Sequence, residues 1–156
     1  MLRVTKGAAL VGKILGRGIP QYAEVSIAAA AVATLRATPV TLVSAPGSGK
    51  VNQLLSAEIL LDYTAPGFTE TTDNLAIRYT DGSGTLISQA IECTGFIDQT
   101  ADTLTTVSPK IDAISAKSAS ENKAIVLHNT GDGEFGGSGG SALRVKVLYV
   151  THDTGW

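Results

Sequence analysis

Two strand-like runs on either side of a glycine-rich loop constrain the fold more than any other stretch of the chain. The runs cover residues 124–129 and 142–151, and the loop at 131–140 consists almost wholly of Gly, Ser and acidic residues. In the second run every other residue is apolar, namely Leu143, Val145, Val147 and Tyr149. This two-residue period is typical of a strand with one buried face. The loop is too long for a tight turn, so we expect a long β-hairpin or a β-arch that frames the domain.

Most of the remaining chain also has strand character. Turn-forming Gly, Pro and Asp separate the expected strands, which are residues 39–43, 51–63 with a bulge near Ser56, 74–80 and 86–92. Residues 81–84 predict a hairpin turn, because Gly supplies the positive φ angles that such turns need. The segments 94–107 and 111–116 fit strand, turn or loop.

Two stretches predict short helices. The alanine-rich segment 26–35 favours a helix that ends before Pro39, and Ser118 with Glu121 resembles a capping box around one helical turn. Strands still dominate and do not alternate with long helices. This pattern favours an all-β fold, an antiparallel sandwich that is jelly-roll-like, with one or two short helices.

Residues 1–24 predict an extended N-terminal arm ahead of a β-sandwich domain at 25–156. No acidic residue precedes Glu24, and the basic residues are Arg3, Lys6, Lys13 and Arg17. The apolar residues that would be buried if the arm docked on another subunit are Leu10, Val11, Ile14 and Leu15. A disordered terminus and contact with nucleic acid are the alternatives for this segment.

Composition narrows the class of protein. A chain of 156 residues with 44% hydrophobic residues is typical of one folded domain. The formal net charge of -2 argues against a dedicated nucleic-acid binder. The single cysteine, Cys93, cannot form an intrachain disulfide, and we expect it to be a buried free thiol. No uncharged apolar run reaches about 18 residues, so we expect no transmembrane helix. Lys13 interrupts the apolar run near the N-terminus and no convincing cleavage site follows it, so we expect no signal peptide.

The motifs that suggest chemistry lack the residues that the chemistry requires. Residues 44–51, SAPGSGKV, resemble a P-loop, but Ser44 stands where Gly is needed and Val51 where Ser or Thr would hold magnesium. No zinc spacing relates the possible ligands near the frame strands, which are His128, Asp132, Glu134, His152 and Asp153. No Gly-x-Ser-x-Gly elbow is present, and aromatic residues make up only 5% of the chain. We therefore expect no catalytic residue, no metal and no cofactor.

Several phrases of the sequence, taken together, resemble small β-rich proteins of tailed-bacteriophage virions. The phrases are LRATPVTLVSAPGSGK, LAIRYTDGSG, CTGF at 93–96, and NKAIVLHNTGDGEFGGSGGSALRVKVLYV, and they cover roughly residues 34–151. The role to which the resemblance points is that of a capsid decoration, or cement, protein. It implies a jelly-roll-like domain, assembly as a homotrimer, and attachment over the joints between major capsid subunits. The shared phrases are turns and core strands, so no functional residue carries over from the family.

We therefore expect a non-enzymatic virion structural protein that binds the assembled phage head and stabilises it by bridging major capsid subunits. It would be made in the bacterial host cytoplasm and lie on the outer surface of the capsid. Its partners would be the major capsid protein and further copies of itself, not nucleic acid or membrane. The expected capsid-docking residues are those of the arm: Arg3, Lys6, Leu10, Val11, Lys13, Ile14, Leu15 and Arg17. The alternative is a head-fibre or tail module that binds a receptor or glycan through exposed aromatic residues.

Overall fold

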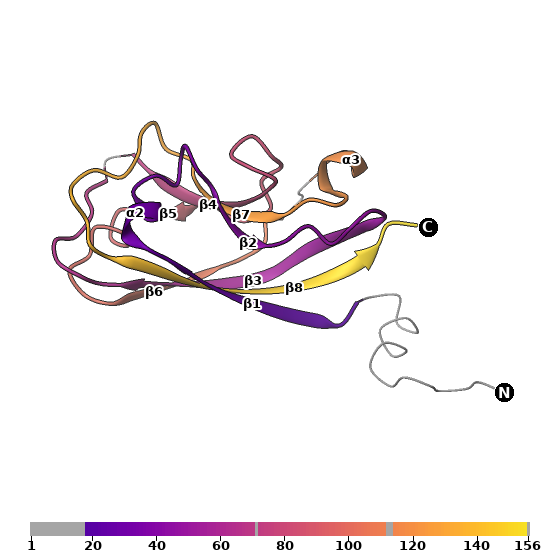
Figure 1. Cartoon of the computed structure of the whole chain (residues 1–156), viewed down its shortest axis with the longest axis horizontal. Helices are drawn as coiled ribbons and strands as arrows, with labels where there is room; N and C mark the ends of the chain where they lie inside the picture. The colour runs from indigo at the N-terminus through magenta and orange to yellow at the C-terminus, as the bar shows by residue number, and fades with distance from the viewer. Residues whose placement is uncertain (1–17, 71, 112–113, 156) are drawn as a thin grey trace.

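The computed structural model describes residues 18–70, 72–111 and 114–155, which fold into two facing sheets (Figure 1). Each sheet has four strands, and all neighbouring strands are antiparallel. Sheet A contains, in spatial order, β1 (Pro20–Ile27), β8 (Ala142–Asp153), β3 (Lys50–Asp62) and β6 (Thr103–Val107). Sheet B contains β2 (Val40–Val43), β7 (Ile125–Asn129), β4 (Asn74–Tyr79) and β5 (Ile91–Glu92). The two described helices, α2 (Ala29–Val32) and α3 (Lys117–Ser120), have four residues each.

This architecture confirms the expected all-β antiparallel sandwich with two short helices, whereas jelly-roll connectivity stays a prediction. The core lies between the sheets, where alternating side chains from both are buried. Its largest fully buried members include Ile59, Leu61, Leu75, Ile77, Ile125, Leu127 and Leu143. Burying these side chains is the main favourable term for the fold, at roughly 1.5–3 kcal/mol for each of them.

The two frame strands belong to different sheets. β7 pairs with β2 and β4 in sheet B, and β8 pairs with β1 and β3 in sheet A. The glycine-rich loop therefore crosses from one sheet to the other, so the frame is a β-arch and not a hairpin. Along β8, Leu143 and Val145 are buried while Arg144 and Lys146 are exposed, as their alternation predicts.

A bulge in β3 switches which residues face the core. The pairing of β3 with β8 shifts between Leu54 and Ser56, close to the bulge expected near Ser56. Before the shift Asn52 and Leu54 are buried, and after it Ala57 is the next fully buried residue. One extra residue in a strand reverses its side-chain alternation, which explains why even positions give way to odd ones.

The expected helix over 26–35 is too long. The strand β1 continues to Ile27, because its whole length pairs with β8 in unbroken register from Pro20 opposite Val150 to Ile27 opposite Leu143. Tertiary pairing thus overrides the helix propensity of the first residues, and only α2 is helical. The same pairing places residues 20–24, expected in the arm, within sheet A.

Two further local expectations are corrected. A helical turn forms at α3, but its N-cap residue is Ala116, whose side chain makes no capping hydrogen bond. The prediction of a capping box between Ser118 and Glu121 is therefore wrong. The expected return strand over 86–92 is broken into a bridge at Leu86 and the short β5. Between them the Ser88 hydroxyl accepts a hydrogen bond from the Ile77 backbone N–H at 2.9 Å, in place of a regular ladder bond.

Candidate binding groove

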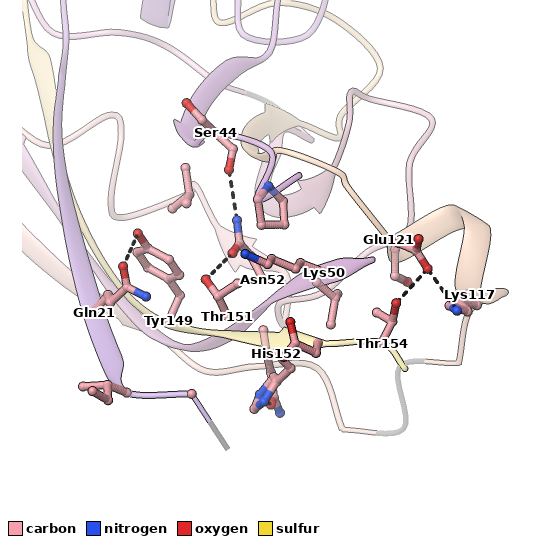
Figure 2. Close-up of a pocket in the computed structure, with 18 of the residues that line it drawn as sticks. Gln21, Ser44, Lys50, Asn52, Lys117, Glu121, Tyr149, Thr151, His152 and Thr154 are labelled. Carbon is pink, nitrogen blue, oxygen red and sulfur yellow. Dashed lines mark hydrogen bonds and ion pairs between the residues drawn. The ribbon is translucent and has the colours of Figure 1, made fainter. Parts of the chain in front are cut away.

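A groove opens at the end of the sandwich where sheet A extends past β2. The strand β2 ends at Val43, whereas the pairing of β3 with β8 continues to Lys50 opposite Asp153. The groove has a volume of about 1560 Å³ and is bordered by β1, β2, β3, β8 and the region of α3 (Figure 2). Its apolar lining includes Ala23, Leu42, Val43, Pro46 and Val51, and its polar lining includes Gln21, Asn52, Tyr149 and Thr151.

The buried amide of Asn52 organises the floor of the groove. Its side chain donates to the Ser44 backbone oxygen at 3.0 Å and accepts from the Thr151 hydroxyl at 2.8 Å. The hydroxyl of Tyr79 donates to the backbone oxygen of Asn52 at 2.6 Å, and burial raises the pKa of Tyr79 to about 12. Asn52 is only 1% exposed, so these bonds replace the water that a buried amide would otherwise need. The floor is therefore fixed by bonds between three strands and the end of β2.

The carboxylate of Glu121 fixes one wall. It accepts hydrogen bonds from the Gly49 N–H at 3.0 Å and the Thr154 hydroxyl at 2.9 Å, and it pairs with Lys117 Nζ at 3.2 Å. These contacts lower the pKa of Glu121, and the hydrogen bond from Thr154 has the largest effect. The backbone N–H of Thr154 also donates to the Gly49 oxygen at 2.8 Å. The start of β3, the segment after β8 and α3 are thereby held together.

The P-loop-like segment 44–51 is the connection from β2 to β3. Its two glycines, Gly47 and Gly49, have positive φ angles of 96° and 74°. Their N–H groups donate to the side chains of Asn122 and Glu121, at 2.9 Å and 3.0 Å. The backbone donors that a P-loop offers to phosphate are thus bonded here to side chains of the chain itself, and a strand follows as expected.

The groove combines charged groups of both signs with hydroxyl and amide groups. Lys50 and Asp153 lie opposite each other at its end, and His152 is hydrogen-bonded to Gln53 at 2.8 Å. Among the described lining residues, no hydroxyl is hydrogen-bonded to a histidine, the arrangement that activates a serine nucleophile. An open shape with a mixed lining offers contacts along an extended surface and does not enclose a small ligand.

The structure does not bring the possible metal ligands together. Asp132 accepts from the Thr72 hydroxyl at 3.0 Å, and Glu134 accepts from the backbone N–H groups of Arg36 and Ala37. His128 lies on β7 in sheet B, whereas His152 and Asp153 lie on β8 in sheet A. Within residues 18–70, 72–111 and 114–155, no three His, Cys, Asp or Glu side chains form a group that could hold a metal ion.

The predicted docking residues of the arm lie outside the described residues. They are Arg3, Lys6, Leu10, Val11, Lys13, Ile14, Leu15 and Arg17. The prediction for Cys93 is confirmed, because its thiol is fully buried and burial raises its pKa to about 12. In the part of the chain that the structure describes, no helix has the length and apolar character needed to cross a membrane.

The glycine-rich loop makes specific packing and hydrogen-bond contacts that its composition does not predict. Gly136 exchanges two backbone hydrogen bonds with Thr69, at 2.8 Å and 2.9 Å. Phe135 is buried, and its ring packs at 51° to that of Phe68 with a centroid separation of 6.2 Å. A side chain at Gly139 would collide with the Phe68 ring, since a Cβ there would lie 2.4 Å from it. The loop therefore covers the end of the core opposite the groove, a role that sequence reasoning missed.

Sequence reasoning also missed the groove, although a signal for it exists. The inward positions of the long strands change from apolar to polar toward one end, at Asn52 on β3 and at Thr151 on β8. Such a change indicates that the second sheet no longer covers the first. The sequence matches no protein-family model and no curated protein.

Proposed function

We propose that the chain is a non-enzymatic structural protein of a tailed-phage virion, a capsid decoration protein that bridges major capsid subunits on the outer surface of the head. The observation that supports this most directly is the position of β1 at an edge of sheet A. Gly18 precedes β1, which is the edge strand of sheet A. The basic and apolar segment ahead of Gly18 thus joins the domain at a sheet edge, a place where a chain can reach a neighbouring subunit.

The proposed mechanism is mechanical linkage. A protein that binds the assembled shell, and not the separated subunits, stabilises the shell by mass action. At a free concentration of about 100 times the dissociation constant, the gain is roughly 2.7 kcal/mol per site. A homotrimer would grip several sites at once, and its avidity would exceed the affinity of one copy. The long antiparallel ladder between β3 and β8 gives each copy a stiff body between its attachments.

A surface on the outer face of sheet A adds to the contacts available for assembly. Tyr22 on β1 is 73% exposed and lies opposite Leu148 on β8, which is also exposed. The next outward row carries charges of alternating sign, with Lys146 between Glu24 and Glu58. This face therefore offers both apolar and charged contacts to a neighbouring protein.

Cosedimentation of the full-length protein with assembled heads and with unassembled capsid subunits tests the proposal. We expect binding to heads only, and we expect decorated heads to retain their DNA at higher temperature. Absence of binding to heads would overturn the proposal. Binding to host cells or glycans in place of heads would favour the head-fibre or tail alternative.

A second experiment tests the arm separately. It uses a full-length variant in which serine replaces each apolar residue of the arm, namely Leu10, Val11, Ile14 and Leu15. Loss of head binding is expected, because these side chains would supply the buried contact area. The matched control is Leu104→Ser, which changes an exposed apolar residue on β6. Equal binding by both variants would remove the arm from the proposal. Substitution is cleaner than deletion of residues 1–24, which would remove part of β1.

A further inference from the structure

The turn that follows β4 covers the outer face of sheet B. This turn, residues 80–85, is called the tip here. The Tyr79 N–H donates to the Thr85 oxygen at 3.0 Å, and Arg78 Nη1 donates to the Gly84 oxygen at 2.9 Å. Within the tip, the Asp81 carboxylate accepts from the N–H and the hydroxyl of Ser83. The tip is thus a compact turn that one arginine ties to the sheet.

The tip buries His128 against sheet B. His128 lies on β7 opposite Ala76 of β4, on the side away from the core, and is only 8% exposed. The backbone of Gly82 packs against its imidazole so closely that a Cβ on Gly82 would lie 2.4 Å from Nε2. The Nδ1 atom has no hydrogen-bond partner and no contact with solvent. A proton added to the ring is therefore poorly solvated while the tip stays in place.

Charged groups reach the imidazole from four directions. The charge of Arg78 on β4 opposes its protonation. Arg36, in the segment between α2 and β2, favours protonation through its backbone and opposes it, to a smaller extent, through its charge, and Glu134 of the β7–β8 loop favours it. Asp81 of the tip also interacts with His128, but the pKa of Asp81 is lowered first by its hydrogen bonds from Ser83 and only last by His128. Two cations and two anions thus surround one buried ring. Burial decides the balance, and together with Arg78 it lowers the pKa of His128 below its ordinary value of 6.5.

The base of the tip has an unfavourable backbone conformation. Thr80 has a φ of 68°, in the left-handed region, which is rarely adopted by a β-branched residue. Its N–H donates to the Ala124 oxygen at 2.9 Å, which fixes the residue in this state. Because strain of this kind persists only where surrounding contacts enforce it, loosening those contacts releases it. The tip is consequently held closed by packing and not by local preference.

We propose that residues 80–85 form an acid-sensitive lid: protonation of His128 lifts them from sheet B and exposes the imidazole to solvent. Opening would therefore place a solvated cation on the outer face of sheet B. The inference concerns a different face from the groove and does not depend on the proposed function.

The direction of the pH effect follows from proton linkage. The closed form takes up a proton less readily than the open form, in which His128 has its ordinary pKa of 6.5. Closure is thus unaffected well above pH 6.5 and is weakened as the pH falls toward the lower pKa of the closed form. Between the two values, the opening equilibrium increases by up to about tenfold for each pH unit.

Backbone hydrogen exchange of the full-length protein, measured at about pH 7.5 and about pH 5, tests the lid. After correction for the intrinsic rate at each pH, we expect faster exchange in residues 80–85 at the lower pH. The amides of the β3–β8 ladder serve as the internal reference and should keep their protection. An unchanged corrected rate in the tip would overturn the proposal.

Three variants assign the effect. His128→Gln removes the titrating group and should abolish the pH response, whereas His152→Gln, the matched control on β8, should leave it intact. Gly82→Ala should open the tip at both pH values, because its Cβ meets the imidazole. A pH response that persists in His128→Gln would refute the lid. Should that variant not fold, NMR titration of the natural protein decides, and titration of His128 at or above 6.5 would refute it.

Discussion

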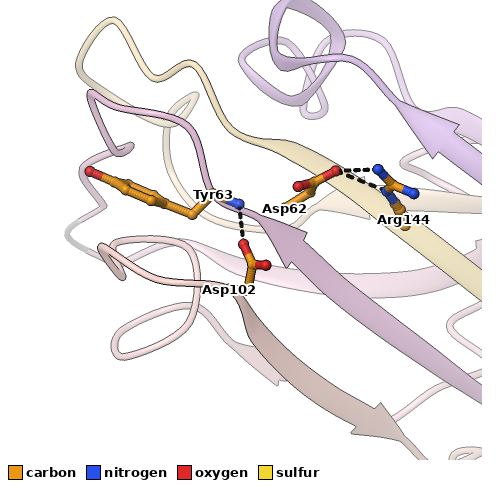
Figure 3. Close-up of polar contacts among 4 residues, drawn as sticks. All are labelled: Asp62, Tyr63, Asp102 and Arg144. Carbon is orange, nitrogen blue, oxygen red and sulfur yellow. Dashed lines mark hydrogen bonds and ion pairs between the residues drawn. The ribbon is translucent and has the colours of Figure 1, made fainter.

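Arg144 on β8 donates two hydrogen bonds to one carboxylate oxygen of Asp62 on β3, from Nε at 2.9 Å and from Nη2 at 2.6 Å (Figure 3). The side chains are 56% and 35% exposed, so water and salt screen the pair. Next to it, the Asp102 carboxylate accepts from the Tyr63 backbone N–H at 2.9 Å and joins the end of β3 to the start of β6 (Figure 3). Polar contacts thus mark the end of sheet A that lies farthest from the groove.

The exposed pair between Asp62 and Arg144 should contribute little to stability. In a double-mutant cycle with Asp62→Asn and Arg144→Met, we expect a coupling free energy below about 1 kcal/mol. Urea unfolding measures it, and about 1 M sodium chloride should reduce it further by screening. A coupling above about 2 kcal/mol would mean that the pair behaves as a buried one.

Removing the Asn52 amide should destabilise the protein far more. Asn52→Ala removes a buried amide and leaves the Ser44 oxygen and the Thr151 hydroxyl, which are partly buried, without their partner. We expect the free energy of unfolding to fall by about 1–3 kcal/mol, the usual penalty for an unsatisfied buried group. The matched control is Gln53→Ala, at the exposed neighbouring position of β3, with an expected change within about 0.5 kcal/mol. Equal losses in the two variants would contradict the role given to Asn52.

The parts of the fold that could be predicted are those that local pattern determines. The alternation of Leu143 and Val145 with charged residues predicts β8. Residues 81–84 predict the turn after β4, although its positive φ lies at Thr80 and not at Gly82 or Gly84. An apolar run with a bulge predicts β3. Each signal lies within a few residues of the element that it specifies, so no knowledge of distant partners is needed.

The parts that could not be predicted depend on contacts between distant segments. Residues 26 and 27 precede an alanine-rich run that favours helix, but pairing with β8 makes them strand. Glu121 looks like the end of a capping box, yet its carboxylate binds Gly49 and Thr154, which are remote in sequence. The groove also depends on distant segments, because it exists only where sheet A extends beyond the end of β2 in sheet B. Such features follow from the tertiary arrangement and leave only faint traces in local sequence.

Acidification should loosen the wall of the groove that Glu121 holds. The folded state depresses the pKa of this carboxyl below its ordinary value of 4.5, so the folded state binds the proton less readily. Its contribution to stability is therefore present above pH 4.5 and is lost as the pH falls through the lower folded pKa. Thermal unfolding of the natural protein and of Glu121→Gln measures it. The difference in Tm should be clear at neutral pH and vanish in acid.

The control for this experiment is Glu58→Gln, an exposed carboxyl on the outer face of sheet A. This variant should shift Tm little, and by a similar amount across the pH range. A Glu121→Gln difference that stays constant from neutral pH into acid would contradict the titration. The wall would then depend on the shape of the side chain and not on its charge.

The thiol of Cys93 should report on opening of the core. It is fully buried, its sulfur lies 3.7 Å from the Ile91 oxygen, and burial raises its pKa to about 12. Since the thiolate is the reactive form, a disulfide reagent at about pH 8 should label the folded protein very slowly and the unfolded protein at once. Labelling in increasing urea should follow global unfolding measured by circular dichroism. Rapid labelling of the folded protein would mean that the segment around β5 opens on its own, independently of the rest of sheet B.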